Sequence, residues 1–479
     1  MEFETVIGLE IHVELSTDSK MFCSCSAGFG GEPNTKTCPV CLGHPGSLPV
    51  PNRRAVNDTI LLALALNCDI TGCSIFHRKN YFYPDMPKNF QISQYDIPIS
   101  SGGTLEIDMG EYTRTVGITR VHLEEDTGKS VHVGESGRIH GAEYSLEDFN
   151  RAGIPLAEIV SEPDLRTPDE ARKFMQLLHS TIRYLEISDC KMEEGSLRCD
   201  ANISVAVDGS MGTKVEIKNM NSFRAMHRAL TYEEQRQRRT IRDGGEVVQE
   251  TRHWDDARGT TSPLRSKEEA FDYRYFPEPD LVPLEPDEAW VRELREGLPE
   301  LPGDRVRRFV SEYGLSREIA ETLTGERALA DYFEDAAGKG QDPVAVAKWI
   351  AGDLGALLND AAVTIQSCPV GTGGLSELVE LIDGGVISGK MAKDVLKEAF
   401  ETGNSPRLIV EEKGLTQIAD ESELDTLVDE VIEENPGAAD DMRDGKEQAL
   451  KFLMGQVMKK TRGKANPKAA SDIIRKRLT

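Results

Sequence analysis

Apolar and ionisable residues alternate without interruption in Gly8–Leu15, near the start of the chain. One side of this segment is aliphatic and the other is ionisable, with Leu9, Ile11, Val13 and Leu15 against Glu10, His12 and Glu14. A period of two is typical of a β-strand with one buried face. Side chains on one face repeat about every 7 Å, so Glu10 and His12 are close enough to share a divalent cation. Taken alone, the segment also fits a solvated strand face.

The rest of the first 290 residues shows further short strand patterns between Gly and Pro turns, with three helical patterns among them. The predicted strands are Thr5–Leu15, Thr104–Ile107, Thr113–Val121, Ser130–Val133, Ala201–Val207 and Thr213–Lys218. The predicted helices are Arg53–Leu66, Thr167–Leu185 and Ser222–Asp243. Tight turns join several strands and regular βαβ units are missing, so the pattern predicts an α+β fold, an antiparallel sheet with helices packed on it.

A Pro-rich passage, Phe276–Pro286, is expected to close this block as a linker. After it the strand pattern ends. Helices are predicted from about Asp287 to Thr402, among them one continuous helix over Pro343–Leu358, and a small helical unit follows. The sequence therefore predicts three domains, residues 1–290, 291–404 and 405–479.

Further carboxylates of the first block fall on or beside predicted strands. They lie in four segments, His122–Asp126, Ile154–Asp164, Lys191–Ser204 and Val215–Asn221. A carboxylate on an apolar strand costs free energy unless it is paired or binds a metal. Several carboxylates from separate strands would repel one another unless a cation neutralised them, and oxygen ligands with one imidazole suit a hard cation. Together these segments favour a cation site over a solvated face.

The composition is that of globular domains, with 29% charged and 39% hydrophobic residues in 479. The sequence has no apolar run long enough for a membrane span. The acidic N-terminus Met1–Glu4 lacks the basic and apolar regions of a signal peptide, so we expect a cytoplasmic protein. The net charge of −26 argues against a uniformly basic nucleic-acid surface.

Four of the nine cysteines are clustered, as Cys23-x-Cys25 and Cys38-x2-Cys41. Two close pairs of thiolates separated by a short loop suit a tetrahedral Zn²⁺ ion. Residues 23–41 are therefore predicted to form a structural, zinc-ribbon-like insert. The first pair has one intervening residue where two or more are usual, and unligated cysteines are the alternative.

Basic and aromatic residues are mixed in the Pro-punctuated segment Arg78–Lys88, which we expect to be a rigid loop. Its cations can hold phosphates and its rings can stack on a base; an aromatic turn packed on the core is the alternative. Three other cations lie beside the acidic segments and fit either phosphate contacts or salt bridges: Arg151, Arg198 and Lys218.

The C-terminal unit changes its sign of charge abruptly. Residues 411–444 hold 13 acidic and 2 basic side chains, whereas residues 446–479 hold 10 basic and 2 acidic ones. Four of the basic residues cluster beside a predicted turn at Asn466-Pro467: Lys459, Lys460, Arg462 and Lys464. In an acidic chain such a cluster indicates contact with a phosphate backbone, with a solvated helix end as the alternative.

Long strings in one order along nearly the whole chain are similar to one protein family. They include GLEIHVEL, FCSCS, CPVCLG, RKNYFYPD, DCKMEEGSLRCDANIS, VEIKN and DYRYFPEPDL. They resemble the GatB family, the B subunits of the glutamyl-tRNA(Gln)/aspartyl-tRNA(Asn) amidotransferase. The related GatE family carries an inserted domain, for which the chain after the Pro-rich passage leaves no room.

The resemblance implies a ligase that forms a carbon–nitrogen bond with glutamine as the amide donor. This subunit would use ATP and Mg²⁺ to phosphorylate the side-chain carboxylate of a mischarged Glu-tRNA(Gln) or Asp-tRNA(Asn). Ammonia from a glutaminase subunit, GatA, would then displace the phosphate, and a small subunit, GatC, would complete a heterotrimer. The implied domains are a catalytic cradle, a helical domain and a YqeY-like tail that binds the tRNA.

Carried over position by position, the resemblance implies the residues of the metal centre, and the patterns described above supply the other three sets of candidates. The catalytic and Mg²⁺-binding candidates are Glu10, His12, Glu125, Glu158 and Asp200, with Glu124, Glu193 and Glu194 as weaker ones. Among these we expect Glu10, His12 and Glu125 to lie closest to the metal. The candidates for ATP and substrate binding are Arg78, Lys79, Tyr81, Tyr83, Lys88, Arg151, Arg198 and Lys218. Zn²⁺ would bind at Cys23, Cys25, Cys38 and Cys41, and tRNA at Lys459, Lys460, Arg462 and Lys464.

A second hypothesis from the sequence is a non-catalytic tRNA-binding scaffold whose acidic segments form surface networks. Mg²⁺-dependent ATP hydrolysis stimulated by mischarged tRNA separates the two hypotheses. A scaffold has no reason to hydrolyse ATP, whereas a kinase subunit must do so.

Overall fold

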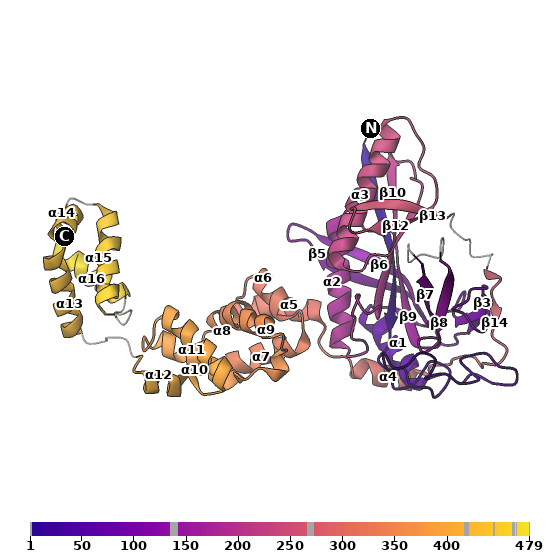
Figure 1. The fold of residues 1–479 in the computed structure, drawn as a ribbon, viewed down its shortest axis with the longest axis horizontal. Helices are drawn as coiled ribbons and strands as arrows, with labels where there is room; N and C mark the ends of the chain where they lie inside the picture. The colour runs from indigo at the N-terminus through magenta and orange to yellow at the C-terminus, as the bar shows by residue number, and fades with distance from the viewer. Residues whose placement is uncertain are drawn as a thin grey trace. The chain divides into compact units, whose positions relative to one another are not determined.

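The computed structural model describes residues 2–134, 142–265, 273–415, 421–443, 446–461, 465 and 467–478. The chain divides into two units, Met1–Gly303 and Asp304–Thr479. The described strands all belong to the first unit, and the described part of the second unit is helical (Figure 1). The α+β fold predicted from the sequence is therefore confirmed.

A nine-stranded sheet forms the centre of the first unit. Its strands run in the order β13-β12-β11-β10-β1-β9-β6-β5-β2. Neighbouring strands are antiparallel except β11 and β12, which are parallel. The bounds are β1 (Phe3–Glu14), β2 (Asp69–Ile70), β5 (Ser100–Asp108), β6 (Thr113–Glu125), β9 (Pro155–Ser161), β10 (Leu197–Val207), β11 (Val215–Lys218), β12 (Thr251–Asp255) and β13 (Thr260–Arg265).

The alternation in β1 produces a strand with one apolar and one polar face. Leu9, Ile11 and Val13 are buried in the hydrophobic core of the unit, whereas Glu10 and His12 are only half-buried. Each fully buried aliphatic side chain of this kind contributes about 1.5–3 kcal/mol to folding. A shift of register by one residue would place Glu10 and His12 in that core, so the pattern specifies which face of β1 is polar.

Three helices pack on the apolar side of the sheet: α1 (Arg53–Ala65), α2 (Pro168–Tyr184) and α3 (Phe223–Arg242). In Figure 1, α2 and α3 lie along one side of the large sheet, with β3, β7, β8 and β14 on the other. Thr167 caps α2 by accepting a hydrogen bond from the Glu170 N–H, and Ser222 caps α3 through the Ala225 N–H. These caps start both helices where the sequence predicted them to start.

The first unit extends further than the predicted boundary at residue 290. Helix α4 (Glu288–Glu296) belongs to it, because Trp290 packs against the core and donates a hydrogen bond to Asn57 in α1. The Pro-rich passage is not a free linker either. Its start forms β14 (Phe276–Pro277), and Glu278 is buried. The passage is therefore part of the fold of the first unit.

Two smaller sheets stand beside the large one. The first has the order β14-β3-β4, with β3 (His77–Asn80) and β4 (Phe90–Ser93), and the second pairs β7 (Lys129–Val133) with β8 (Tyr144–Asp148). The expectation that Arg78–Lys88 is a loop throughout is wrong for its first three residues, which lie in β3. Pairing with β4 makes them a strand, and the loop is confined to residues 81–89.

The second unit contains two separate hydrophobic clusters. The first draws on residues from Val306 to Val410 and the second on residues from Leu424 to Leu478. The predicted boundary at 404 falls too early, because Ile409 and Val410 of α12 pack in the first cluster. None of the helices in the described part of the chain has the length and apolar character that crossing a lipid bilayer requires.

The helices of this unit follow one another with short connections. Their bounds are α5 (Pro302–Tyr313), α6 (Arg317–Leu323), α7 (Arg327–Ala337), α8 (Pro343–Trp349), α9 (Gly355–Ala361), α10 (Thr372–Asp383), α11 (Gly389–Thr402), α12 (Pro406–Lys413), α13 (Glu421–Glu434), α14 (Pro436–Arg443), α15 (Glu447–Lys460) and α16 (Pro467–Leu478). The continuous helix predicted over Pro343–Leu358 is interrupted, because a π-helical turn, Ile350–Leu354, separates α8 from α9. Such a turn arises from backbone hydrogen-bond register, which the apolar pattern does not report.

Candidate functional site

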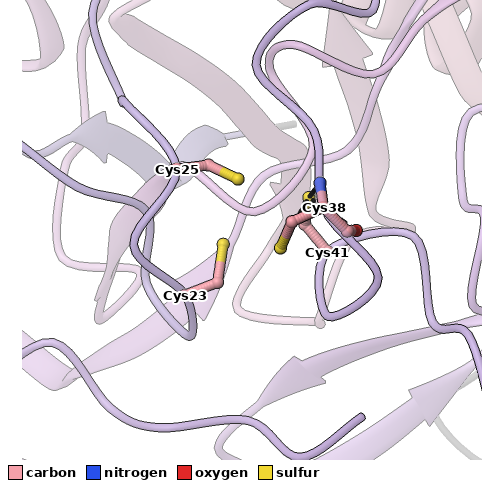
Figure 2. A group of neighbouring side chains, drawn as sticks. All are labelled: Cys23, Cys25, Cys38 and Cys41. Atoms are coloured by element: carbon pink, nitrogen blue, oxygen red, sulfur yellow. Dashed lines mark hydrogen bonds between the residues drawn. The ribbon is translucent and has the colours of Figure 1, made fainter.

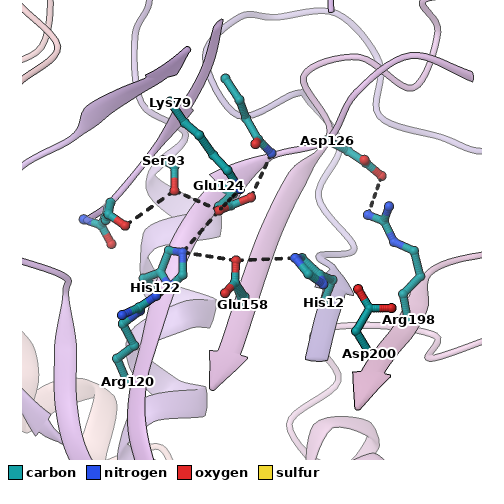
Figure 3. A network of polar contacts seen from close by, with 12 residues as sticks. His12, Lys79, Ser93, Arg120, His122, Glu124, Asp126, Glu158, Arg198 and Asp200 are labelled. Carbon is teal, nitrogen blue, oxygen red and sulfur yellow. Dashed lines mark hydrogen bonds and ion pairs between the residues drawn. The ribbon is translucent and has the colours of Figure 1, made fainter. Parts of the chain in front are cut away.

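A row of charged side chains crosses four adjacent strands on the polar face of the large sheet. In register, Arg198 of β10 lies opposite His12 of β1, His12 lies opposite Glu158 of β9, and Glu158 lies opposite His122 of β6. Residues directly opposite in an antiparallel pair project from the same face. Figure 3 shows the result, with Glu158 between the two imidazoles.

Glu158 is the centre of this row. Its Oε2 lies 3.4 Å from His12 Nε2 and 3.4 Å from His122 Nε2. Burial acts to raise the pKa of Glu158, but the two imidazoles outweigh it and hold the pKa well below its ordinary value. Burial acts to lower the pKa of His12, and the carboxylate of Glu158 more than offsets this, so the net shift is upward. Burial also acts to lower the pKa of His122, but the charge of Glu158 and the hydrogen bonds with Glu124 and Glu158 outweigh it and raise the pKa to about 9.

Two sets of ligand atoms in this row are close enough to hold a metal ion. Glu10, His12 and Glu158 form one set, and His122, Glu124 and Glu158 form the other, with the atoms of each set within 4.8 Å of one another. Carboxylate oxygens with one imidazole suit a hard divalent cation. Burial and the nearby charge of Glu158 raise the pKa of Glu10, and a cation in the first set would oppose that shift.

Asp200 extends the first set across the next strand. It lies opposite Glu10 in the register of β1 and β10. Its carboxylate forms an ion pair with Lys218 of β11, whose ammonium also lies 3.6 Å from Glu216. The structure thus brings Glu10, His12, Glu158 and Asp200 to one face, and Lys218, which the sequence also named as a candidate, is the cation beside them.

Glu124 faces the same site and is held by several donors. Gln91 Nε2 and Ser93 Oγ of β4 donate to its two oxygens at 2.8 Å each, and Lys79 Nζ of β3 lies 3.8 Å away. Lys79 also lies over the ring of Tyr273, 5.1 Å from its centroid. The small sheet β14-β3-β4 therefore covers the end of β6 and brings Lys79 close to Glu124.

The structure does not bring Glu125 into this site. Its carboxylate accepts hydrogen bonds from the Lys88 ammonium and from the Ile92 N–H. Glu124 and Glu125 are consecutive in a strand, and consecutive side chains of a strand point to opposite faces. The expectation that Glu10, His12 and Glu125 lie closest together is therefore corrected: Glu158 takes the place expected for Glu125.

Glu125 instead lines a cavity of about 220 Å³ next to the cysteine cluster. The other charged residues around this cavity are Lys20, Lys88, Arg78, Glu278 and Asp280. Arg78 does not face it as a free cation, because its guanidinium forms two hydrogen bonds with Glu278, at 2.6 and 2.8 Å. The cavity has charge of both signs on its walls and opens beside Cys41.

Most predicted phosphate-binding cations are paired with carboxylates. Arg198 donates to Asp126 at 2.8 Å, and Arg151 lies 3.6 Å from the same carboxylate. Burial, followed by the charge of Asp126, raises the pKa of Glu14 to about 8. Arg151, Arg198 and Lys218 thus each form an ion pair with a neighbouring carboxylate.

The predicted aromatic residues lie in a larger group of tyrosines. Tyr81 is in edge contact with Tyr83, at 6.2 Å between ring centroids, and with Tyr273, also at 6.2 Å. Burial raises the pKa of Tyr81, whereas Tyr83 is exposed. Sequence reasoning did not single out Tyr273 or Tyr275 as site residues, although both stand at alternate positions in the string DYRYFPEPDL. It also did not single out His122, although His122 and Glu124 repeat the i, i+2 pattern of Glu10 and His12.

The four clustered cysteines converge, as Figure 2 shows. The sulfur atoms of Cys23, Cys25, Cys38 and Cys41 lie within 4.8 Å of one another. The Cys38 N–H donates to Cys41 Sγ at 3.1 Å. A hydrogen bond from Cys23 lowers the pKa of Cys41 to about 5, against the effect of burial. Four sulfurs in this arrangement fit a structural metal ion.

The remaining predicted residues do not join these sites. Glu193 and Glu194 are exposed, and Glu194 pairs with Lys191 at 2.9 Å. In the tail, Lys459 is exposed, while Lys460 lies 2.7 Å from both Glu430 and Glu434. Arg462 and Lys464 lie outside the described residues.

Comparison with known proteins gives matches along the whole chain. A family model described as the GatB/GatE catalytic domain matches residues 5–292, and one described as the GatB domain matches residues 331–478. The chain is 54% identical to the B subunit of the aspartyl/glutamyl-tRNA(Asn/Gln) amidotransferase of Carboxydothermus hydrogenoformans, covering 100% of this chain and 99% of that protein. It is 55% identical to the protein of the same name from Moorella thermoacetica, with 100% of both chains covered. The protein of that name from Brevibacillus brevis is 51% identical, over 100% of this chain and 99% of its own length.

Proposed function

This chain belongs to the GatB family of tRNA-dependent amidotransferase subunits, and on that basis we propose that its polar sheet face activates the carboxylate of a mischarged aminoacyl-tRNA. The observation that carries the proposal is Glu158 between His12 and His122, with Glu10 beside them. This is a dense set of hard ligands on one face of a rigid sheet, as phosphoryl transfer with a divalent cation requires. The substrates are Glu-tRNA(Gln), Asp-tRNA(Asn) or both.

The reaction has two steps. In the first, an oxygen of the substrate carboxylate attacks the γ-phosphorus of ATP, the bond to the β-phosphate oxygen breaks, and ADP leaves with its electron pair. In the second, ammonia attacks the carbonyl carbon of the acyl phosphate, phosphate leaves, and a proton is lost from nitrogen to give the amide. Carboxylates do not react with ammonia directly, so the first step supplies the leaving group.

The donor set fits Mg²⁺ at Glu10, His12 and Glu158, with Asp200 on the next strand. Mg²⁺ would neutralise the charge that develops on the transferred phosphoryl group. This chain's own residues would bind the phosphates and the tRNA base. Lys79 and Lys218 border the polar face from two sides and would hold phosphate oxygens, and the ring of Tyr81 or Tyr273 would stack on the terminal base of the tRNA.

Glu125 and Lys88 have a separate role in this proposal. Their ion pair lines the cavity behind the end of β6. A reactant that approaches the reacting carbon through this cavity would therefore contact Glu125 and Lys88. Ammonia made by a glutaminase subunit is the small polar reactant that must arrive. We place this ion pair on its route, with a small third subunit completing the complex in the cytoplasm.

The cysteine cluster would hold Zn²⁺ as a structural ion, since four thiolates around one ion complete its tetrahedral shell. The tail that follows the first cluster, residues 416–479, would contact the tRNA body through Lys459, Lys460, Arg462 and Lys464. Lys460 is paired with two glutamates, so phosphates would have to compete with Glu430 and Glu434 for it.

The test is ATP hydrolysis by the reconstituted complex with Mg²⁺ and mischarged tRNA. We expect hydrolysis to depend on both, and to be coupled to formation of Gln-tRNA(Gln) or Asn-tRNA(Asn) when glutamine is present. A scaffold subunit would leave hydrolysis unchanged when mischarged tRNA is added. That result would reject the catalytic proposal and favour the non-catalytic alternative.

A further inference from the structure

The cysteine cluster has an inner neighbour that the sequence did not single out. Lys20 is one of the largest fully buried side chains of the first unit, with 1% of its surface exposed. Among the described residues its ammonium has two hydrogen-bonding contacts: Nζ lies 3.8 Å from Cys41 Sγ and donates to the Phe149 carbonyl oxygen at 3.1 Å. Within the described residues, no carboxylate forms an ion pair with it.

A buried ammonium without a negative partner is unfavourable. Removing such a group from water costs several kcal/mol, and a neutral carbonyl or thiol returns only part of this. Without a metal ion the cluster offers Lys20 at most one thiolate, that of Cys41. Four thiolates around one divalent ion, in contrast, carry two negative charges in excess, and one of those thiolates is Cys41.

We propose that Lys20 is the internal counter-charge of the four-cysteine metal centre, a positioning residue that favours the metal-loaded state. The inference rests on the proposed Zn²⁺ site. The ammonium would donate to the Cys41 thiolate and reduce the charge of the cluster by one. Hydrogen bonds to ligand atoms from residues around a metal set its affinity in this way.

Lys20 also joins the metal centre to the rest of the first unit. Its backbone N–H bonds to the Cys25 carbonyl, and the next N–H, that of Met21, bonds to the Gly153 carbonyl at 2.7 Å. A Cβ at Gly153 would lie 3.4 Å from the Lys20 side chain, 3.5 Å from Cys41 and 3.7 Å from Glu125. The segment from Phe149 to Gly153 thus packs on the cysteine cluster and the cavity together, and Lys20 links that segment to the metal ligand.

The experiment compares the full chain with Lys20→Met, which keeps the length of the side chain and removes its charge. Lys36→Met is the control, because Lys36 lies in the same cysteine-containing segment but bonds to an exposed carbonyl, that of Gly28. Zinc affinity is measured by competition with a chromophoric chelator. We expect affinity to fall about 10- to 100-fold in Lys20→Met and to stay within about twofold of the original chain in Lys36→Met.

Thermal unfolding with and without zinc separates a counter-charge from a merely structural lysine. If Lys20 is compensated mainly by the loaded cluster, Lys20→Met lowers the midpoint of the zinc-loaded chain more than that of the metal-free chain. A structural lysine would lower both midpoints by the same amount, and this result would overturn the inference.

The zinc measurement also distinguishes failure of the inference from failure of the site itself. If the original chain binds zinc and Lys20→Met binds it equally tightly, the Lys20 assignment is wrong and the metal centre stands. If the original chain binds no zinc, both are wrong.

Discussion

Glu124 and Glu125 are adjacent in β6, yet their carboxylates serve two different environments. Glu124 accepts from Gln91 and Ser93 on the polar face of the sheet, whereas Glu125 accepts from Lys88 and the Ile92 N–H beside the cavity. Both are buried. The end of β6 therefore separates the candidate active site from the cavity next to the cysteine cluster. Glu124 faces the first and Glu125, the next residue, faces the second.

The Lys88–Glu125 pair gives a first prediction. Glu125→Gln and Lys88→Met each leave a buried charge without its partner, so each should lower the free energy of unfolding by about 3 kcal/mol. The double variant should lose less than the sum of the two, by up to about 3 kcal/mol. Urea unfolding of the four proteins in this double-mutant cycle measures the coupling, and additive losses would mean that the pair is not formed in solution.

Glu158→Gln gives a second prediction. The substitution keeps the size of the side chain but removes the negative charge between His12 and His122. We expect tRNA-stimulated ATP hydrolysis to fall at least about 100-fold, since a direct ligand should matter more than the outer contacts whose loss costs about 10- to 100-fold. Glu111→Gln, in an exposed turn, is the control and should keep full activity. Hydrolysis at the original rate in Glu158→Gln would remove Glu158 from the site.

The elements of the first unit were predictable where their signal is local. The alternation in β1, the Thr167 cap with Pro168 and the Ser222 cap are each encoded within a few residues, and the structure has the predicted elements there. The pairing of strands is not local. The sequence of Gly8–Leu15 does not determine that Asp200 lies opposite Glu10 or that His122 approaches Glu158. The register arises from packing of the whole sheet.

The Glu125 expectation failed for a related physical reason. Glu124, Glu125 and Asp126 are three consecutive acidic residues. Which of them faces the site can be predicted only when it is known which alternate residues of the strand face the core. These are Val121 and Leu123, which are buried in the core, so that His122 and Glu124 share the polar face. Applied to β6 as it was to β1, the period of two would have selected Glu124 over Glu125.

Glu170 gives a prediction on pH. It is fully buried at the start of α2 and accepts from the Arg166 N–H, Tyr112 Oη and the Arg114 guanidinium. Burial acts to raise its pKa, but these donors hold the pKa below its ordinary value of 4.5. A carboxyl whose pKa is lowered by folding stabilises the fold above its unfolded-state pKa, and the contribution is lost as the pH falls through the folded-state value.

The measurement for Glu170 is the difference in unfolding free energy between the original chain and Glu170→Gln as a function of pH. At pH 7 we expect the variant to be less stable by about 1–3 kcal/mol, because a glutamine cannot accept from all three donors. The difference should shrink below pH 4.5 as Glu170 takes up a proton. A difference in unfolding free energy that does not change with pH would show that the negative charge of Glu170 does not stabilise the fold.

The cysteine cluster gives a prediction on metal removal. Cys38→Ser should release the bound metal and lower the midpoint of thermal unfolding by at least about 4 °C, because the binding free energy of a structural ion is also folding free energy. A strong chelator added to the original chain should give the same shift. Cys73→Ser is the control, since Cys73 is exposed and lies outside the cluster. Equal midpoints for all three proteins would leave the four cysteines without a structural role.

The tail gives the last prediction, and the structure changes how it must be tested. A truncation at residue 404, the predicted boundary, would remove α12 and with it Ile409 and Val410, which pack in the first cluster of the second unit. Removing residues 416–479 keeps that cluster whole. We expect this truncation to weaken tRNA binding at least about 10-fold and to reduce the dependence of binding on salt, because phosphate contacts by basic side chains release counterions.

ATP binding should stay unchanged in the truncated chain, since the candidate active site lies in the first unit. Within the tail, Glu430→Gln and Glu434→Gln together should strengthen tRNA binding, because they release Lys460 from its two carboxylate partners. Affinity and salt dependence that are the same with and without residues 416–479 would show that the basic cluster is a solvated helix end. In that case the remaining residues 1–415 would have to hold the tRNA.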